Sequence, residues 1–169
     1  MDYGSRQLFL HRAEDGTGGR EALQTWINSM ADRGAIDSAE AALVSVERVL
    51  TFLNSPLAAR MENAWKENRL YREQPFVMGC PADEVIADAP ASLHAETVTV
   101  QGIIDAFLIE NDRIILVDYK TDRVNTEDTL ILRYRTQLSL YADALERAFG
   151  LPVAQKIIYS TALGREIVL

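Results

Sequence analysis

Apolar residues recur every three or four positions near the start of the chain, which is the spacing of one helix face. Leu23, Ile27 and Met30 follow this spacing and predict a first helix. The glycine-rich stretch 15–19 just before it is typical of a flexible turn. We therefore expect a poorly patterned N-terminal segment over residues 1–20, ahead of the helices.

A second apolar run, from Leu43 to Leu53, has the same spacing and predicts another helix. Ser38 precedes this run and is the expected N-cap residue. Pro56 should end the helix, and a shorter helix is expected to follow it. Residues 21–66 are thus predicted to be helical.

The middle of the chain changes to a strand-like pattern. Strands are predicted over 70–78, 97–109 and 113–119, where β-branched and aromatic residues are frequent. Asn111-Asp112 suits a tight hairpin, because both residues tolerate left-handed backbone conformations. The stretch 81–95 has no clear period and is expected to be a loop with at most one helical turn.

A long amphipathic helix is predicted over residues 126–149, after the hairpin, and Gly150 should end it. Its apolar stripe consists of Leu130, Tyr134, Leu138, Tyr141, Leu145 and Ala148. Two final strands follow, over 156–161 and 166–169. Helices, three strands, one helix and further strands predict an α/β fold with a mixed sheet over 70–169, flanked by helices.

Composition narrows the class of protein. With 169 residues, 48% apolar and 25% charged, the chain is long enough for a single domain, residues 1–169, with a real core. The one cysteine, Cys80, excludes a disulfide framework or a cysteine zinc site and favours a reducing compartment, the cytoplasm. No apolar run approaches the ~18 residues that span a bilayer. The net charge of −8 is unlike that of most nucleic-acid binders.

Two acidic residues lie within strongly apolar strands, Asp105 in GIIDAF and Asp118 in ILVDYK. If Asn111-Asp112 forms a two-residue turn, paired residues have numbers that sum to 223, so Asp105 lies opposite Asp118. Lys120 follows Asp118 by two positions and shares its face of the strand, whereas Tyr119 faces the other way. The pattern therefore brings two carboxylates and one ammonium group together.

Opposed carboxylates among apolar side chains require compensating positive charge. Lys120 supplies one charge, and a divalent metal ion, Mg²⁺ or Mn²⁺, would supply the rest. Such a set is typical of phosphodiester cleavage, in which the metal ion activates a water and stabilises developing charge. The alternative is that Asp118 and Lys120 form a simple surface ion pair.

These motifs resemble the PD-(D/E)XK nucleases, and more narrowly the RecB-like nuclease domain of the AddA family of helicase–nuclease subunits. The resemblance covers roughly residues 16–169 and rests on the following segments: YREQPF (71–76), PADEV (81–85), VQGIID (100–105), DYKTDRV (118–124) and QLSLYADAL (137–145). It implies a restriction-endonuclease-like fold. It also implies that Asp105, Asp118 and the Tyr119 main-chain carbonyl bind the metal ion, and that Lys120 is the catalytic lysine.

The resemblance also implies roles for the long helix. Gln137 and Tyr141 are four residues apart and share a helix face, with Arg133 one turn earlier. In the family this face looks onto the active site and positions the DNA backbone, with Arg123, Arg133 and Arg135 as a local basic surface; the alternative is a buried Tyr141 and a solvated Gln137. Glu73 matches an acidic family position and is either near the metal ion or a plain exposed residue.

One position departs from the family pattern. The family carries a histidine ligand in a G-T-x-x-H motif on its first helix, and here Arg20 occupies that position, after Gly16-Thr17. An arginine does not bind a metal ion at neutral pH because its guanidinium stays protonated. His11 could substitute only if the chain folded back, and His94 is expected to be solvated.

The resemblance implies a Mg²⁺-dependent deoxyribonuclease that cuts single-stranded DNA as the nuclease module of an AddA-type helicase–nuclease in double-strand break repair and recombination. Its partners would be the helicase part of such a protein, since no P-loop motif occurs here, and an AddB-type subunit. Two alternatives remain open. One is a catalytically impaired module for DNA binding or assembly, consistent with Arg20 and the acidic charge. The other is a freestanding PD-(D/E)XK nuclease.

Overall fold

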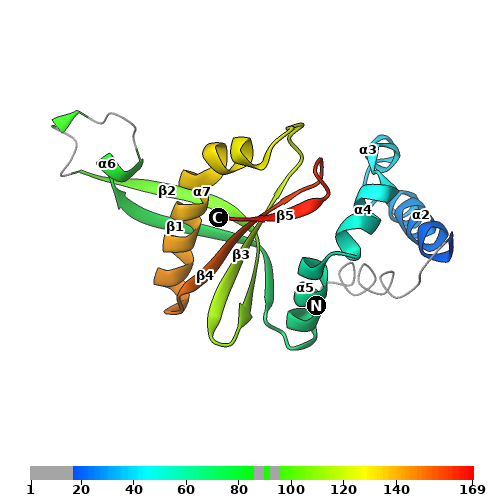
Figure 1. The fold of residues 1–169 in the computed structure, drawn as a ribbon, viewed down its shortest axis with the longest axis horizontal. Coiled ribbons are helices and arrows are strands. Elements are labelled where there is room, and N and C mark those ends of the chain that lie inside the picture. The colour runs from blue at the N-terminus through cyan, green and yellow to red at the C-terminus, as the bar shows by residue number, and fades with distance from the viewer. Residues whose placement is uncertain (1–16, 86–89, 92–95) are drawn as a thin grey trace.

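The computed structural model describes residues 17–85, 90–91 and 96–169, and it contains helices on both sides of a mixed sheet (Figure 1). The elements follow one another in this order: α2 (Thr17–Asp32), α3 (Ser38–Leu43), α4 (Val46–Leu53), α5 (Pro56–Lys66), β1 (Leu70–Pro81), α6 (Ala82–Val85), β2 (Thr97–Glu110), β3 (Arg113–Lys120), α7 (Glu127–Phe149), β4 (Val153–Ser160) and β5 (Arg165–Val168). The predicted succession of helices, strands, one helix and further strands is confirmed. Among the described residues no helix is long and apolar enough to cross a membrane.

The N-terminal helices differ from the prediction at their ends. α2 begins at Thr17, so the last part of the expected turn over 15–19 is helical. Asp37, not Ser38, is the N-cap of α3, because its carboxylate accepts from Ala39 N while Glu40 accepts from Asp37 N, which closes a capping box.

The predicted continuous helix through Leu43 to Leu53 is two helices. Val44 is extended, and the Ser45 hydroxyl accepts from Arg48 N and starts α4. The prediction that Leu43 belongs to the apolar face is wrong, because the break leaves it 85% exposed, whereas Val46 and Leu53 are buried. The Ser45 cap therefore decides where α4 begins, although the apolar spacing continues across the break.

The sheet has the strand order β1-β2-β3-β4-β5, and β3 and β4 are its one parallel pair among the described strands. A parallel pair needs a crossover connection, which α7 provides. α7 ends at Gly150, whose left-handed conformation (φ 67°) caps the helix as predicted.

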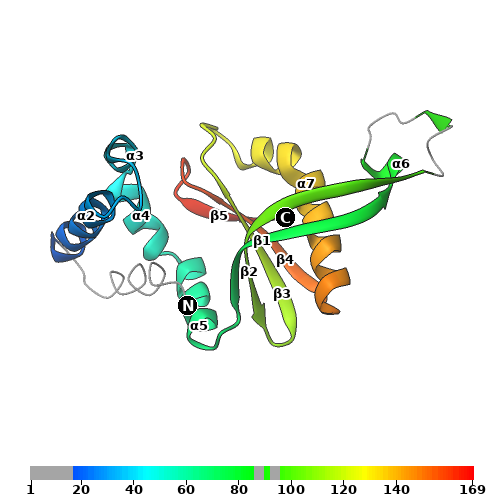
Figure 2. The same cartoon turned by 180° about the vertical axis from the view of Figure 1, so that it is seen from behind.

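The helices form two layers, one on each face of the sheet (Figures 1 and 2). On one face, side chains of α2, α4 and α5 bury residues of β2, β3 and β4, including Ala106, Val117 and Tyr159. On the other face α7 covers residues such as Phe107 and Leu116 with Leu130, Leu138 and Leu145. The predicted end of the α7 stripe, Ala148, is exposed.

The turn between β2 and β3 has the predicted form. Asn111 and Asp112 have φ values of 49° and 57°, which a two-residue turn of the favoured hairpin type requires. The register follows from this turn: Glu110 pairs with Arg113, and the pairing continues to Ala106 and Val117. The register predicted from the sequence is therefore confirmed over these pairs.

Beyond Ala106, β2 pairs only with β1, and the two strands form an arm composed of 74–81 and 97–104. The arm runs past the other strands and carries α6 at its tip (Figures 1 and 2). α7 packs against one face of the arm, because Phe76 contacts Tyr141 and the Arg147 guanidinium donates to Gly79 O at 3.0 Å. The separation of β2 from β3 places the end of β3 at an open edge of the ladder.

Candidate active site at the end of the third strand

The β2–β3 ladder ends at the pair of Ala106 and Val117. In a regular ladder the next hydrogen-bonded pair would be Ile104 with Tyr119, but from Asp105 toward Thr97 β2 pairs with β1 alone. Instead, the Tyr119 N–H donates to the Asp105 carboxylate, with 2.8 Å between N and Oδ2. The side chain of Asp105 thus takes the place that the Ile104 carbonyl would have in a regular ladder, and it lies beside β3 as predicted.

Asp118 is the buried member of the carboxylate pair. Its side chain is 3% exposed, and Oδ2 has no aligned hydrogen-bond donor among the described residues. Burial raises the pKa of Asp118 above its ordinary value; the charge of Asp105 adds to this rise, and Lys120 opposes it. The site therefore contains a desolvated carboxylate with a second carboxylate nearby, and Lys120 is the cation that contacts it.

Lys120 contacts both the sheet and α7. Its Nζ lies 2.7 Å from Asp118 Oδ2 and donates to Gln137 Oε1 at 3.3 Å. Asp118 and Lys120 share one face of β3, as the alternation predicts, and the Lys120 side chain is 15% exposed. The alternative of an exposed surface ion pair does not fit this burial.

Gln137 connects Lys120 to Tyr141. Its amide nitrogen donates to the Tyr141 hydroxyl at 2.7 Å while its oxygen accepts from Lys120. The predicted face of the long helix therefore looks onto the site, and Gln137 is not simply solvated. Tyr141 is half-buried, with its ring 5.4 Å from that of Phe76 in an edge-on contact.

Tyr119 contributes its main chain on one side and its ring on the other. In a strand the N–H and C=O of one residue point to the same edge. Because the Tyr119 N–H is directed at Asp105, its carbonyl is directed at that edge too, where β2 has left β3. The predicted carbonyl ligand thus faces the carboxylate pair.

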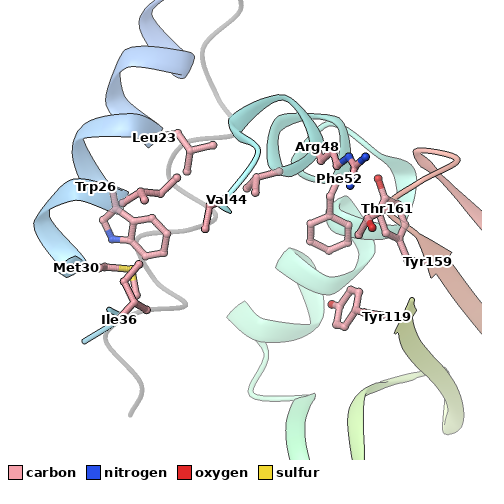
Figure 3. A pocket seen from close by; sticks show the side chains of 12 residues that line it. Leu23, Trp26, Met30, Ile36, Val44, Arg48, Phe52, Tyr119, Tyr159 and Thr161 are labelled. Carbon is pink, nitrogen blue, oxygen red and sulfur yellow. The ribbon is translucent and has the colours of Figure 1, made fainter. Parts of the chain in front are cut away.

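The Tyr119 ring lines an apolar cavity of about 390 Å³ between α2, α4 and the ends of β3 and β4 (Figure 3). Phe52 and Tyr159 line it at the sheet end, and Trp26 and Ile36 line it at the opposite end. Burial raises the pKa of the Tyr119 hydroxyl above its ordinary value. An apolar cavity on the sheet face opposite Lys120 is unsuited to a phosphate, so the chemistry belongs to the α7 face.

Glu73 lies at the register position opposite Asp105, between Arg72 and Gln74, and its backbone has φ 49°. Its side chain is exposed. Within the described part of the chain no three His, Cys, Asp or Glu side chains gather closely enough to hold a metal ion. Glu73 is therefore near the site in register but does not form a three-acid cage with Asp105 and Asp118.

Arg20 lies on α2 and forms an ion pair with Glu47 of α4; both side chains are more than half exposed. The structure thus gives Arg20 an acidic partner outside the carboxylate pair. His11 and His94, the two histidines weighed from the sequence, lie outside the described residues.

The predicted basic surface follows the start of α7. Arg123, Arg133 and Arg135 are exposed, and Arg133 forms an ion pair with Asp122. Part of the positive charge is therefore compensated locally, at Arg133.

Two residues at the site, Tyr134 and Asp122, were missed from the sequence. The ring of Tyr134, predicted only as part of the apolar stripe, has its centroid 4.1 Å from Lys120 Nζ. Its hydroxyl donates to Asp122 Oδ2 at 2.9 Å. The spacing contained a signal, because Tyr134 lies three residues before Gln137 and so shares its helix face.

The donor set fits a divalent metal ion. Asp118 has a buried carboxylate oxygen with no aligned hydrogen-bond donor besides its ion pair with Lys120, Asp105 is adjacent, and the Tyr119 carbonyl faces the same edge. Mg²⁺ commonly binds to one or two carboxylates and completes its shell with waters and substrate phosphates, so a three-acid cage is not required. Asp105, Asp118 and the Tyr119 carbonyl are the groups that would hold it.

The chain is similar in sequence to known nucleases. A family model described as the PD-(D/E)XK nuclease superfamily matches residues 6–166. The match begins before the expected start at residue 16, and so it includes part of the poorly patterned N-terminal segment.

Curated relatives are named as ATP-dependent helicase/nuclease subunits of the A type. That of Lachnoclostridium phytofermentans is 35% identical over 86% of this chain and 13% of its own length. That of Clostridium kluyveri is 37% identical over 90% of this chain and 12% of its own length. That of Acetivibrio thermocellus is 38% identical over 83% of this chain and 11% of its own length. The chain therefore spans about an eighth of the length of the relatives it matches.

Proposed function

Because the chain belongs to the PD-(D/E)XK nuclease superfamily, we propose that it hydrolyses phosphodiester bonds of single-stranded DNA with a divalent metal ion, Mg²⁺ or Mn²⁺. The observation that supports this most directly is the buried Asp118 carboxylate, which stands beside Asp105 and whose Oδ2 lies 2.7 Å from Lys120 Nζ. Asp105 and Asp118 are the proposed side-chain ligands, and the Tyr119 carbonyl is the third.

The bound metal ion would supply Lewis acidity to the scissile phosphate and lower the pKa of a nucleophilic water. Lys120 would donate hydrogen bonds to the attacking water or to the phosphate oxygens as negative charge develops on them. Its contacts with Asp118 and Gln137 fix the ammonium in advance, so little reorganisation is needed when the charge appears.

The face of α7 would position the DNA backbone. Gln137 and Tyr141 form a hydrogen-bonded pair next to Lys120, and Arg123, ahead of α7, and Arg135, on α7, are exposed. Guanidinium groups at this place would attract phosphates to an otherwise acidic protein. Glu73 would act only indirectly, because its side chain is exposed.

The relatives suggest the larger setting. They are helicase/nuclease subunits of which this chain corresponds to about an eighth. We place the chain in the nuclease module of an AddA-type helicase–nuclease that acts in double-strand break repair and recombination in the cytoplasm, and whose partners are a helicase part and an AddB-type subunit. A catalytically impaired module that only binds DNA is the second candidate, favoured by Arg20, which would deprive the metal ion of the family's histidine.

The test measures metal binding and cleavage in parallel. Calorimetry with Mn²⁺ should show binding to the wild type and to Lys120→Ala, and a loss of affinity in Asp118→Ala. An end-labelled single-stranded oligonucleotide should be cut in Mg²⁺ or Mn²⁺ but not in EDTA, and Lys120→Ala should slow cleavage by ~10²-fold or more. Lys66→Ala, which removes an exposed lysine paired with Glu62, is the matched control and should cleave normally.

Different failures have different meanings. Equal Mn²⁺ affinity in the wild type and Asp118→Ala would exclude the proposed metal site. Metal and DNA binding without cleavage would favour the non-catalytic module. If Lys120→Ala loses its cooperative unfolding transition, the lysine is a structural partner of Asp118.

A further inference from the structure

The Lys120 ammonium has an aromatic neighbour that the proposed mechanism does not use. Nζ lies 4.1 Å from the centroid of the Tyr134 ring, in addition to its contacts with Asp118 and Gln137. A cation over the face of an aromatic ring is attracted by the ring's negative face, more strongly where water is excluded. With a side chain only 15% exposed, Lys120 meets that condition.

The Tyr134 ring is itself held in place. Its hydroxyl donates to Asp122 Oδ2 at 2.9 Å, and Arg133 pairs with the other oxygen of the same carboxylate. Asp122 lies in the segment that leaves β3, two residues after Lys120, whereas Tyr134 and Arg133 belong to α7. These contacts fasten the end of β3 to the helix directly beside Lys120.

We propose that Tyr134 is a positioning residue for Lys120, and that Asp122 acts through Tyr134. A lysine side chain is a flexible four-carbon stem and its ammonium is a point charge without directional preference. Asp118 and Gln137 contact the ammonium on two sides, and the face of the Tyr134 ring contacts it on a third side. The proposal rests on the function proposed for Lys120, but the juxtaposition itself can be measured without cleavage.

A merely structural role is the competing explanation, since Tyr134 packs against the apolar cluster under α7. The two explanations differ in what they require. Positioning requires the ring to contact Lys120 and the hydroxyl to hold the ring at Asp122, so Tyr134→Phe should keep part of the effect and Tyr134→Leu should lose it. Tyr71→Leu is the matched control, because Tyr71 packs against the same cluster and stacks on Phe107, with ring centroids 4.6 Å apart.

Nuclear magnetic resonance gives a direct readout because the chain has only three lysines, at positions 66, 120 and 156. With ¹³C-labelled lysine, the ε-methylene protons of Lys120 should be shifted upfield by the ring current of Tyr134. The shift should persist in Tyr71→Leu, decrease in Asp122→Asn and at least as much in Tyr134→Phe, and disappear in Tyr134→Leu. The Lys66 and Lys156 signals should stay unchanged throughout and serve as internal references.

Kinetics provide the second readout. Tyr134→Leu should lower kcat by about tenfold, which is the range of one cation–aromatic contact. KM for DNA and the affinity for Mn²⁺ should stay within about twofold of the wild type, since only the orientation of Lys120 changes. Tyr134→Phe should lower kcat less than Tyr134→Leu does, because it keeps the ring and loses only the hydrogen bond to Asp122. A general loss of packing would instead lower kcat to a similar extent in Tyr71→Leu and Tyr134→Leu.

The outcomes separate this proposal from the proposed function. An absent upfield shift in the wild type, or an unchanged Lys120 signal in Tyr134→Leu, would overturn the positioning role whether or not the protein cleaves DNA. If the wild type does not cleave DNA but Lys120 shows the expected shifts, the contact is real and the nuclease function is wrong. If Tyr134→Leu does not fold, the wild-type shift and its decrease in Asp122→Asn decide the question.

Discussion

The main-chain N–H of Tyr119 donates to Oδ2 of Asp105, 2.8 Å away, where a regular ladder would use the carbonyl of Ile104. This single hydrogen bond joins the two strands after their backbones have separated. It also fixes one oxygen of Asp105. The carboxylate that we propose as a metal ligand therefore has a structural partner on β3.

Burial of Asp118 predicts a particular dependence of stability on pH in EDTA. A folded-state pKa above the ordinary value of 3.8 means that the folded protein retains the proton to higher pH than the unfolded chain does. The free energy of unfolding of the wild type should therefore fall as the pH rises through this window, relative to that of Asp118→Asn. Urea unfolding of both proteins across the acidic range measures the difference.

Addition of Mn²⁺ at neutral pH should instead raise the free energy of unfolding of the wild type relative to that of Asp118→Asn. At 100 times Kd, a ligand that binds only the folded state stabilises it by about 2.7 kcal/mol. The wild type should gain such stability and Asp118→Asn should not. A parallel pH dependence in the two proteins, with equal responses to Mn²⁺, would contradict the role of Asp118.

The Gln137–Tyr141 pair should affect cleavage more than metal binding. Tyr141→Phe keeps the ring against Phe76 and removes only the hydroxyl that accepts from Gln137, and Gln137→Ala removes both hydrogen bonds. Each change should slow cleavage by about tenfold, the cost of one or two hydrogen bonds, with the Mn²⁺ affinity unchanged. Leu132→Ala, on the exposed side of α7, is the control. Normal cleavage by both variants would mean that Gln137 and Tyr141 serve only in packing.

Gly102 should be intolerant of a larger side chain. A Cβ atom at this position would lie 2.9 Å from Cε1 of Phe76, and the rigid ring is backed by Tyr141. We expect Gly102→Ala to lower the free energy of unfolding by about 1–3 kcal/mol, as overpacking does, and to displace Tyr141 from Gln137. Urea unfolding and cleavage rates measure the two effects. Gly34→Ala is an unsuitable control because of its positive φ, so Ala59→Gly on α5 serves to report ordinary helix destabilisation.

Arg20→His tests which residue occupies the position of the family histidine. If Arg20 does, a neutral imidazole should tighten Mn²⁺ binding and speed cleavage, because it removes a positive charge and offers a ligand nitrogen. His11→Ala should then change neither quantity. The family match begins at residue 6 and includes His11. Loss of affinity in His11→Ala, with no gain in Arg20→His, would therefore move the histidine position to His11.

The sequence predicted the part of the site that depends on local geometry. A two-residue turn at Asn111-Asp112 sets the register of β2 against β3, and alternation then places Asp118 and Lys120 on one face. Helical spacing likewise placed Gln137 and Tyr141 together. These relationships need no knowledge of distant segments.

The contacts that the sequence did not predict join segments far apart in the chain. The Lys120–Tyr134 contact depends on how α7 packs on β3, and the Arg20–Glu47 pair depends on how α2 crosses α4. The helix break at Ser45 was missed for another reason: a hydroxyl cap and a continuous apolar spacing compete, and the spacing alone does not show which is stronger.

The change of partners at Asp105 has a mechanical consequence. On one side of this residue β2 is clamped between two strands, and on the other it belongs to an arm with β1 alone. Asp105 therefore lies where the arm joins the rest of the sheet, and α6 lies at the far end of the arm. The arm reaches α7 through Phe76 and Gly79, so the carboxylate pair and the Gln137–Tyr141 face share one mechanical support.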